Sequence, residues 1–501
     1  ARGVRFDAAV SPAPLTLPAH ASLMTALDPP AHGVRHNSIY RLGADIPTLA
    51  ERLRDAGYAT AAFVGAVVLD RRYGLDRGFD LYDDDISGRR SGALGFVERS
   101  AADVVDAALA WLESAPPRFF LWVHLYDPHA SYDPPAGFAS AFASHPYAGE
   151  IAYVDAQLGR LFDGIRRKWG EEGLLRVVTS DHGESLGEHG EPTHAYTLYE
   201  ATQRIPLLIE GPGVPPGRVV SGVVRLTDVA PTILSWTGAR SLGEGRGEDL
   251  GPLIAGSDHD GRTAYMETVA TQLNFGWSPL LGLRSGRFKY IRAPRPELYD
   301  LGADPDERID LAPGEPRLVA RLDRELEALI PDSPLPPSFA RVSEAERARL
   351  RSLGYLMPGP PSDPTEIGQV GGVDPKDQIG VLAVLADAER ALGAGRPLEA
   401  LEHLEDLEDE GTAVASLRAV AALAAGRVGL AERAARIALR QQPERSDLLM
   451  VLARALEAQG RFEAAGRAYQ AASALDPELA AASIGAARAR QRERGSGATA
   501  R

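Results

Sequence analysis

Short apolar runs alternate with helical patterns through the first half of the chain. Four of these runs have the length of buried strands, and they cover residues 58–64, 119–126, 174–178 and 205–209. Strands that alternate with helices are typical of a parallel sheet whose two faces are covered. The pattern therefore predicts an α/β core over residues 1–237, with a mostly parallel sheet sandwiched by helices.

Residues 238–356 show a different pattern, with shorter alternating runs and more turn residues. We interpret them as a small α+β subdomain that packs on the core. Its expected parts are two strands, a turn-rich segment and a closing helix, at residues 281–284, 288–291, 297–301 and 343–353. A stretch rich in Pro and Gly follows at 357–375 and is predicted to be a linker.

The remainder of the chain is Ala-rich and repeats itself. Three pairs of residues lie 34 positions apart: Gly426 and Gly460, Ala431 and Ala465, and Pro443 and Pro477. This period resembles the tetratricopeptide repeat, and a weaker copy begins around Gly395. We expect an all-α repeat domain at 376–490, able to bind a protein partner, and a tail at 491–501. A coiled coil is the alternative, but heptads do not explain the 34-residue register.

The composition excludes several classes of function. The chain has 501 residues and a formal net charge of -15, without the basic surface typical of nucleic-acid binding. No apolar run approaches the roughly 20 residues that span a bilayer. The absence of cysteine from the sequence excludes disulfides and thiolate metal sites.

An Asp-His pair lies at the position where α/β sheets carry their ligand-binding and catalytic residues. Asp181 and His182 follow the apolar run 174–178 directly, so they lie at the carboxyl end of a predicted strand. A carboxylate and an imidazole side by side can provide two ligands to a divalent metal ion. The alternative is a structural turn at the strand end.

A hydroxyl near residue 16 is a second candidate. Thr16 stands two residues before Pro18, which suits the first turn of a helix. The positive end of that helix would stabilise an alkoxide or a bound anion, so Thr16 is a candidate nucleophile. His20, one turn further on, can reach the same anion. The simpler interpretation is that Thr16 is the helix N-cap.

Taken together, these residues resemble the sulfatase family of the alkaline phosphatase superfamily, over residues 1–356. Residues 16–25 are similar to the family's Cys/Ser-x-Pro-x-Arg nucleophile signature. The other matching segments, in chain order, are 30–37, Asp127–Pro128–His129, Asp181–His182, His194 followed by 198–200 and 206–207, and 297–301 followed by 304–307.

The resemblance implies roles for these residues. Asp181 and His182 would hold a divalent metal ion, with Ca, Mn and Zn as the candidates. His129 and His194 would contact the ester oxygens or protonate the leaving group. The substrate would be a sulfate or phosphate ester of unknown identity. An extracytoplasmic or periplasmic location is also implied by the family alone.

Several positions depart from the family pattern. Family sulfatases oxidise Cys or Ser to formylglycine, which Thr16 cannot form, and their signature arginine is replaced by His20. Their Lys and His after the next strand are replaced in residues 65–67. A plain Thr resembles the nucleophile of the superfamily's phosphodiesterases and phosphotransferases, which tilts the expectation towards phosphate esters.

Family members also carry an earlier strand that ends in metal-binding Asp residues, and no segment of this sequence matches it. We therefore expect the metal site formed by residues 1–501 to be incomplete and the chain as given to be an inactive fragment. A non-catalytic scaffold with a decayed site is the alternative to an enzyme. His124, His189 and Lys289 are interpreted as structural.

Overall fold

The computed structural model describes residues 2–498, except positions 38, 87–98, 131, 171, 244, 258–260, 332–334, 341–363, 408–410, 444 and 476–478. The chain forms two compact units. The first contains residues 1–189, 193–268 and 280–340, and the second contains 190–192, 269–279 and 341–501. The helix expected at 343–353 lies outside the described residues. No described helix is both long enough and apolar enough to cross a bilayer.

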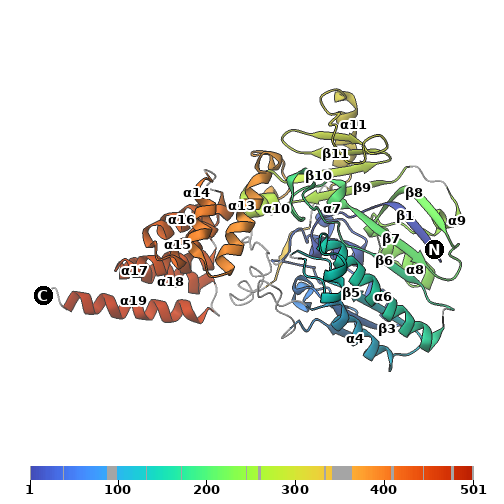
Figure 1. The fold of residues 1–501 in the computed structure, drawn as a ribbon, viewed down its shortest axis with the longest axis horizontal. Helices are drawn as coiled ribbons and strands as arrows, with labels where there is room; N and C mark the ends of the chain where they lie inside the picture. Colours follow the sequence, from blue (N-terminus) through green and yellow to red (C-terminus); the bar gives the residue numbers. More distant parts are fainter. Residues whose placement is uncertain are drawn as a thin grey trace. The chain divides into compact units, whose positions relative to one another are not determined.

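The central strands of the first unit form two groups (Figure 1). One group has the order β4-β3-β5 and is parallel throughout, and the other has the order β6-β7-β1-β8, in which only β1 and β8 are parallel. The four predicted strands correspond to β3, β5, β6 and β7. The bounds are β1 Val4–Val10, β3 Ala59–Val64, β4 Leu81–Asp83, β5 Phe119–His124, β6 Arg176–Thr179, β7 Arg204–Glu210 and β8 Arg218–Arg225.

Strands β5 and β6 each keep one open edge among the described residues. β5 pairs only with β3, and β6 pairs only with β7. Helix α6 (Pro146–Trp169) packs over both, because its Leu161 and Ile165 share one apolar cluster with Val123 of β5 and with Leu174, just before β6. All residues of β5 and β6 are only half-buried, whereas five of the six residues of β3 are fully buried.

Other helices of this unit begin where their sequence provides a cap. The Thr48 hydroxyl accepts from Glu51 N, and the Ser100 hydroxyl accepts from Asp103 N, at the starts of α3 and α4. The bounds are α1 Thr16–Thr25, α2 Pro29–His32, α3 Leu49–Asp55, α4 Ala101–Leu112, α5 Ala136–Ala141, α7 Glu200–Gln203, α8 Val229–Thr237, α9 Gly251–Ala255 and α11 Pro316–Glu327.

A second sheet in the same unit is antiparallel, with the order β12-β11-β10-β9. It confirms the two strands predicted around 281–284 and 288–291 but corrects the turn predicted at 297–301, where β12 pairs with β11. Leu298 and Tyr299 are buried there, and burying them favours a strand over a surface turn. The bounds are β9 Thr263–Thr268, β10 Leu280–Ser285, β11 Phe288–Arg292 and β12 Glu297–Asp300; β2 Tyr40–Arg41 and β13 Ser338–Phe339 form a separate pair.

A buried lysine joins β11 to helix α7 and to the loop after β12. Lys289 on β11 is fully buried, and its Nζ lies 2.9 Å from Glu307 Oε1 and 3.2 Å from Glu200 Oε1. The Glu307 carboxylate also accepts from Glu200 N at 2.6 Å. A buried ammonium is tolerated only with such partners, so Lys289 has the structural role expected of it.

The second unit is all-α (Figure 1). Three of its helices each end in a corner of the same type, formed by a glycine with positive φ and the arginine that follows it. The glycines are Gly395, Gly426 and Gly460, with φ of 72°, 72° and 75°. The amide of that arginine returns to a carbonyl five residues earlier, which closes the helix end. The bounds are α10 Ala270–Phe275, α13 Pro375–Gly393, α14 Pro397–Glu405, α15 Thr412–Ala424, α16 Val428–Gln441, α17 Ser446–Ala458, α18 Phe462–Leu475 and α19 Ala480–Ala498.

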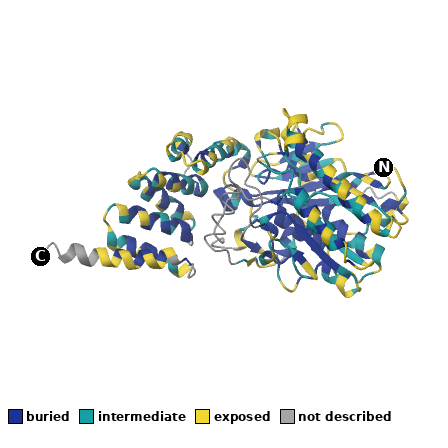
Figure 2. Cartoon of the chain, turned by 60° about the horizontal axis from the view of Figure 1, so that its bottom comes forward, coloured by how far each residue is buried: buried dark blue, intermediate teal, exposed yellow. Residues whose placement is uncertain are grey.

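The helices of this unit bury narrow stripes of small residues, which appear as dark bands along them in Figure 2. Ala453, Ala465 and Ala472 are fully buried in one cluster that α17, α18 and α19 share. Small side chains let neighbouring helices approach closely. Helix α19 continues to Ala498, into the stretch predicted as a tail.

Candidate active site

The start of helix α1 positions Thr16. The helix begins at Thr16 itself, and its N-cap residue is Leu15, which offers no side-chain oxygen. The Asn37 Oδ1 accepts from Leu17 N at 2.8 Å and so caps the first turn from 20 residues away. Thr16 is therefore not the N-cap, and its side chain stands at the positive end of a ten-residue helix.

His20 connects this helix to the sheet. Its Nδ1 donates to the Thr16 carbonyl oxygen at 2.8 Å and lies 3.6 Å from Asp181 Oδ2. The His20 ring also lies 4.9 Å from the ring of His124, the last residue of β5. The start of α1 and the ends of β5 and β6 therefore meet at His20.

Asp181 and His182 follow β6 as predicted. The His182 Nδ1 donates to the Gly183 carbonyl at 2.7 Å, and its Nε2 lies 3.5 Å from Asp181 Oδ2. Burial alone would raise the pKa of Asp181, but His182, His20 and His124 outweigh it and hold that pKa below its usual range. Burial lowers the pKa of His182. The pair therefore combines a carboxylate with a largely neutral imidazole.

His194 and His129 complete the cluster. The His194 ring lies 4.3 Å from the His182 ring and 5.3 Å from the His129 ring. The His129 Nδ1 donates to the Ala130 carbonyl at 2.7 Å, and its ring stacks on Tyr126. Burial, with the neighbouring His194, lowers the pKa of His129 to about 4.

The structure thus brings the six predicted residues, Thr16, His20, His129, Asp181, His182 and His194, into one continuous cluster. Sequence reasoning missed three neighbours of this cluster: Asn37, His124 and Glu184. His124 was assigned to the core, where burial indeed lowers its pKa to about 3, but its ring faces His20. Glu184 accepts from His194 Nδ1 at 3.0 Å. Its position directly after the Asp-His-Gly turn was the available signal.

All four predicted histidines are oriented in the same way. Each Nδ1 lies within 3.0 Å of an oxygen that can only accept: a backbone carbonyl for His20, His129 and His182, and a carboxylate for His194. A hydrogen therefore resides on each Nδ1, and in its neutral form such a ring presents a lone pair at Nε2. Nε2 lone pairs can bind a metal ion or accept a proton.

The donor set suits a metal ion only in part. The Nε2 of His182 and the Oδ2 of Asp181 lie 3.5 Å apart, and a shared cation would relieve the repulsion between their lone pairs. No three His, Asp or Glu side chains gather as a metal site within the part of the chain that the structure describes. Asp181 and His182 therefore offer two donor groups, and the described residues do not add a third to form a metal site.

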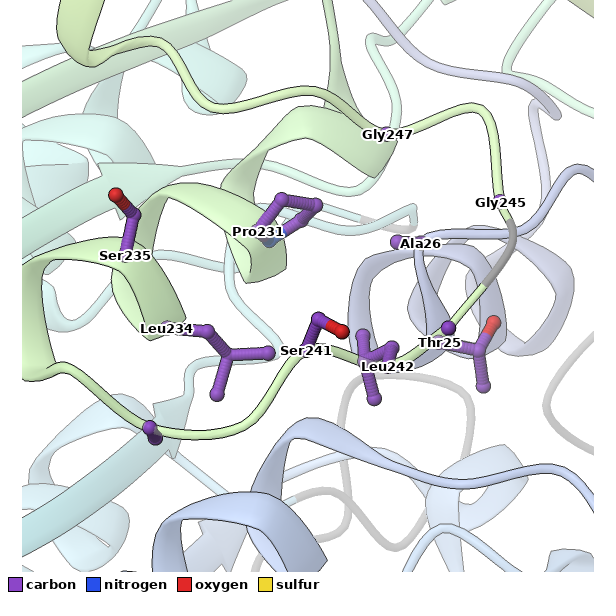
Figure 3. Close-up of a pocket in the computed structure, with 11 residues that line it drawn as sticks. Thr25, Ala26, Pro231, Leu234, Ser235, Ser241, Leu242, Gly245 and Gly247 are labelled. Atoms are coloured by element: carbon purple, nitrogen blue, oxygen red, sulfur yellow. The ribbon is translucent and has the colours of Figure 1, made fainter.

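A cavity of about 230 Å³ lies elsewhere in this unit (Figure 3). Thr25 and Ala26, at the far end of α1 from Thr16, form one wall, and α8 with the loop that carries Ser241 and Leu242 forms the others. A ten-residue helix is about 15 Å long, so this cavity is separate from the histidine cluster. Its described lining residues are uncharged.

A buried histidine outside the cluster makes stability depend on pH. His32 Nδ1 accepts from Val34 N, so its Nε2–H donates to the Ser22 hydroxyl at 2.9 Å. Burial, with Arg35 nearby, lowers its pKa from 6.5 to about 3. The stabilisation is therefore complete above pH 6.5 and is lost as the pH falls towards 3.

We expect this one group to remove about 2 kcal/mol of unfolding free energy between pH 8 and pH 5. The variant His32→Gln should lose less stability over that interval than the unmodified protein, by about the same amount. Urea unfolding followed by tryptophan fluorescence at both pH values measures the difference. His403→Gln, at a 38% exposed position on α14, is the control. Equal losses in the His32→Gln variant and the unmodified protein would contradict the assignment.

Comparisons with known proteins agree with this geometry. Residues 1–239 match the sulfatase family model, and residues 187–331 match the model described as N-sulphoglucosamine sulphohydrolase, C-terminal. Arylsulfatase K of Canis lupus familiaris is 32% identical over 195 residues, which cover 37% of this chain and 36% of the relative. Choline-sulfatase of Rhizobium meliloti is 36% identical over 172 residues, which cover 33% and 32%. The chain therefore spans about a third of the length of these curated relatives.

Solved structures show the same fold. The phosphonate monoester hydrolase of Agrobacterium radiobacter matches with a TM-score of 0.56 and 21% identity, over 68% of this chain and 93% of that one. A protein solved with its substrate D-glucosamine-2-N,6-O-disulfate matches with a TM-score of 0.54 and 19% identity, over 70% and 91%. At such identities the likeness establishes the fold alone. Residues 1–331 are therefore similar in sequence to sulfatases and their C-terminal region, and the α/β part of this chain shares the fold of these solved structures.

Proposed function

We propose that the α/β unit is a hydrolase of sulfate or phosphate esters and that Thr16 is its nucleophile. The observation that carries this proposal is the convergence of α1, β5 and β6 on one cluster of polar side chains. His20 links three parts of the fold: its Nδ1 donates to the Thr16 carbonyl of α1 and lies 3.6 Å from Asp181 Oδ2, just after β6. Its ring also faces that of His124, the last residue of β5. A decayed site has no reason to keep these groups together, so the cluster favours an enzyme over a scaffold.

The first step follows from the position of Thr16. Its Oγ attacks the sulfur or phosphorus atom of the ester, the bond to the leaving oxygen breaks, and the hydroxyl proton passes to a nearby base. The positive end of α1 stabilises the charge on the transferred group. Asn37 keeps this helix end in place through Leu17 N.

The histidines perform the proton transfers. The Nε2 atoms of His129 and His194 are the candidates to accept the proton released by Thr16 and to pass it to the leaving oxygen, and each is held in orientation through its Nδ1. A water molecule then attacks the threonine ester and returns Thr16 to its free form. His20 keeps its Nδ1 on the Thr16 carbonyl and would direct its other nitrogen at the transferred group.

We further propose that Asp181 and His182 are two of the ligands of a divalent metal ion, with Ca, Mn and Zn as the candidates. Such an ion would supply positive charge for the ester oxyanion and the nucleophile. Strand β6 ends at Thr179, just before these two residues, and has only β7 as a partner among the described residues.

A phosphate diester is the second candidate substrate, and Thr16 favours it. A threonine cannot become the formylglycine that family sulfatases use. A plain alcohol nucleophile suits phosphoryl transfer, and one neighbour in fold is named as a phosphonate monoester hydrolase. The relatives in sequence are named as sulfatases, which favours sulfate esters.

For the second unit we propose tetratricopeptide-like repeats at residues 376–490 that bind a protein partner. The recurring Gly-Arg corners and the Ala stripes support this repeat type. An extracytoplasmic location remains a prediction from the family resemblance.

The function is tested by hydrolysis of a matched pair of substrates, an aryl sulfate and an aryl phosphodiester with the same leaving group. We expect the protein to cleave at least one of them in Zn, Mn or Ca buffer and to lose that activity with a chelator, a result that would correct the expectation of an inactive fragment. The faster ester identifies the substrate class. Cleavage of neither ester with any of the three metals would reject the enzyme and favour the scaffold.

A further inference from the structure

One of the four site histidines is held differently from the others. His20, His129 and His182 each bind a backbone carbonyl no more than four residues away. His194 instead donates its Nδ1–H to the carboxylate of Glu184, 10 residues away, at 3.0 Å. The local backbone brings a carbonyl within four residues close to the ring, whereas the fold must position a carboxylate that is 10 residues away.

The backbone around Glu184 provides that positioning. Gly183 N donates to the Thr202 carbonyl at 2.8 Å, and Ser185 N donates to the Thr193 carbonyl at 2.7 Å. The amides on either side of Glu184 are therefore bound to the segment that carries His194. Position 183 requires glycine here, because a Cβ would stand 2.1 Å from the Ala201 carbonyl oxygen.

Glu184 and His194 are also shielded from solvent, with side chains 5% and 8% exposed. A hydrogen bond between a carboxylate and an imidazole gains strength when water is excluded. The His194 ring lies between the rings of His182 and His129, so a turn of the ring would exchange its two nitrogens with respect to the site.

We propose that Glu184 is the positioning residue of His194: it holds the hydrogen on Nδ1 and thereby presents Nε2 to the ester. The effect on catalysis rests on the proposed function, whereas the position of the hydrogen does not. Glu184 accepts from His194 Nδ1, and we expect its contribution to catalysis to come through that histidine.

Imidazole ¹⁵N spectra of the full chain test the hydrogen position directly. In the unmodified protein, the His194 signals, assigned with His194→Gln, should show a protonated Nδ1. Glu184→Gln keeps an acceptor oxygen and should preserve this state, whereas Glu184→Ala should give a mixture of tautomers. Glu188→Ala is the matched control, because the Glu188 carboxylate accepts from Leu186 N in the same loop.

Two spectral results would overturn the proposal. One is an unmodified protein in which neutral His194 carries its hydrogen on Nε2, a result that does not depend on any change at Glu184. The other is a Glu188→Ala variant that disturbs His194 as much as Glu184→Ala does, since the effect would then belong to the loop.

Rates give the second readout. With whichever ester is cleaved, we expect Glu184→Ala to lower kcat about a hundredfold with KM nearly unchanged, and Glu184→Gln to recover most of that loss. Equal kcat values for Glu184→Ala and Glu188→Ala would contradict the positioning role. If no ester is cleaved, the proposed function fails and the spectra alone decide the role of Glu184.

Discussion

Replacing Thr16 with alanine is expected to lower kcat for ester hydrolysis by about ten-thousandfold, the size of loss seen when a covalent nucleophile is removed. Thr16 opens α1, is 3% exposed, and stands one helical turn from His20, whose ring faces Asp181. Without the hydroxyl no covalent ester can form, so only the slow attack of water remains. Steady-state kinetics with the faster of the two aryl esters measure the loss.

Two further variants separate the hydroxyl's chemistry from its packing. Thr16→Ser keeps the hydroxyl and should retain activity within about tenfold, because an alcohol nucleophile is preserved. Thr25→Ala removes a buried hydroxyl from the other end of the same helix, where it donates to the Ala21 carbonyl, and should leave kcat nearly unchanged. An active Thr16→Ala protein would assign the nucleophile to another residue.

The parts of this site that were predictable are those fixed by short segments of sequence. Asp181 and His182 were predicted because an apolar run ended just before them, and β6 ends at Thr179. Thr16 and His20 were predicted from Pro18 and one turn of helix, and α1 begins at Thr16. In both cases the local pattern predicted the element and placed its boundary to within two residues.

The parts that were missed depend on long-range contacts. Asn37 caps α1 across 20 residues, and Glu184 meets His194 across 10. The local sequence does not show which residues these side chains meet, because the chain path between the partners sets the distance, although the position of Glu184 after the Asp-His-Gly turn did place it near the site. The strand β12 was missed for a related reason. Leu298 and Tyr299 form a strand by pairing with β11, and this pairing cannot be read from their own segment.

Strand β1 shows another limit of predicting structure from the sequence. Its burial alternates at Val4, Arg5 and Phe6, but Asp7 and two alanines weaken the apolar pattern. Its place between β7 and β8 comes from pairing with both neighbours, and a single segment does not show that pairing. The repeat corners at Gly395, Gly426 and Gly460 were easier, because a left-handed residue at a helix end favours glycine wherever the helix packs.

The second large effect is expected at Asp181. Asp181→Asn keeps the size of the side chain and removes its charge, and we expect kcat/KM to fall by about a thousandfold and metal affinity to fall with it. Asp181 is the carboxylate that faces His20, His182 and His124, and these neighbours hold its pKa low. Asparagine binds a divalent ion more weakly and offers the histidines no counter-charge.

Calorimetric titration of the full-length protein with Zn, Mn and Ca measures the affinity, and hydrolysis of the same ester measures the rate. Asp163→Asn is the matched control, because it makes the same chemical change on α6 at a side chain that is 54% exposed. If Asp181 is a ligand, affinity and rate fall together in Asp181→Asn, and added metal restores part of the rate. If Asp181 only orients His20 and His182, the rate falls at every metal concentration while the affinity equals that of the Asp163→Asn control. That second result would remove Asp181 from the ligand set and leave His182 as the one proposed ligand among the described residues.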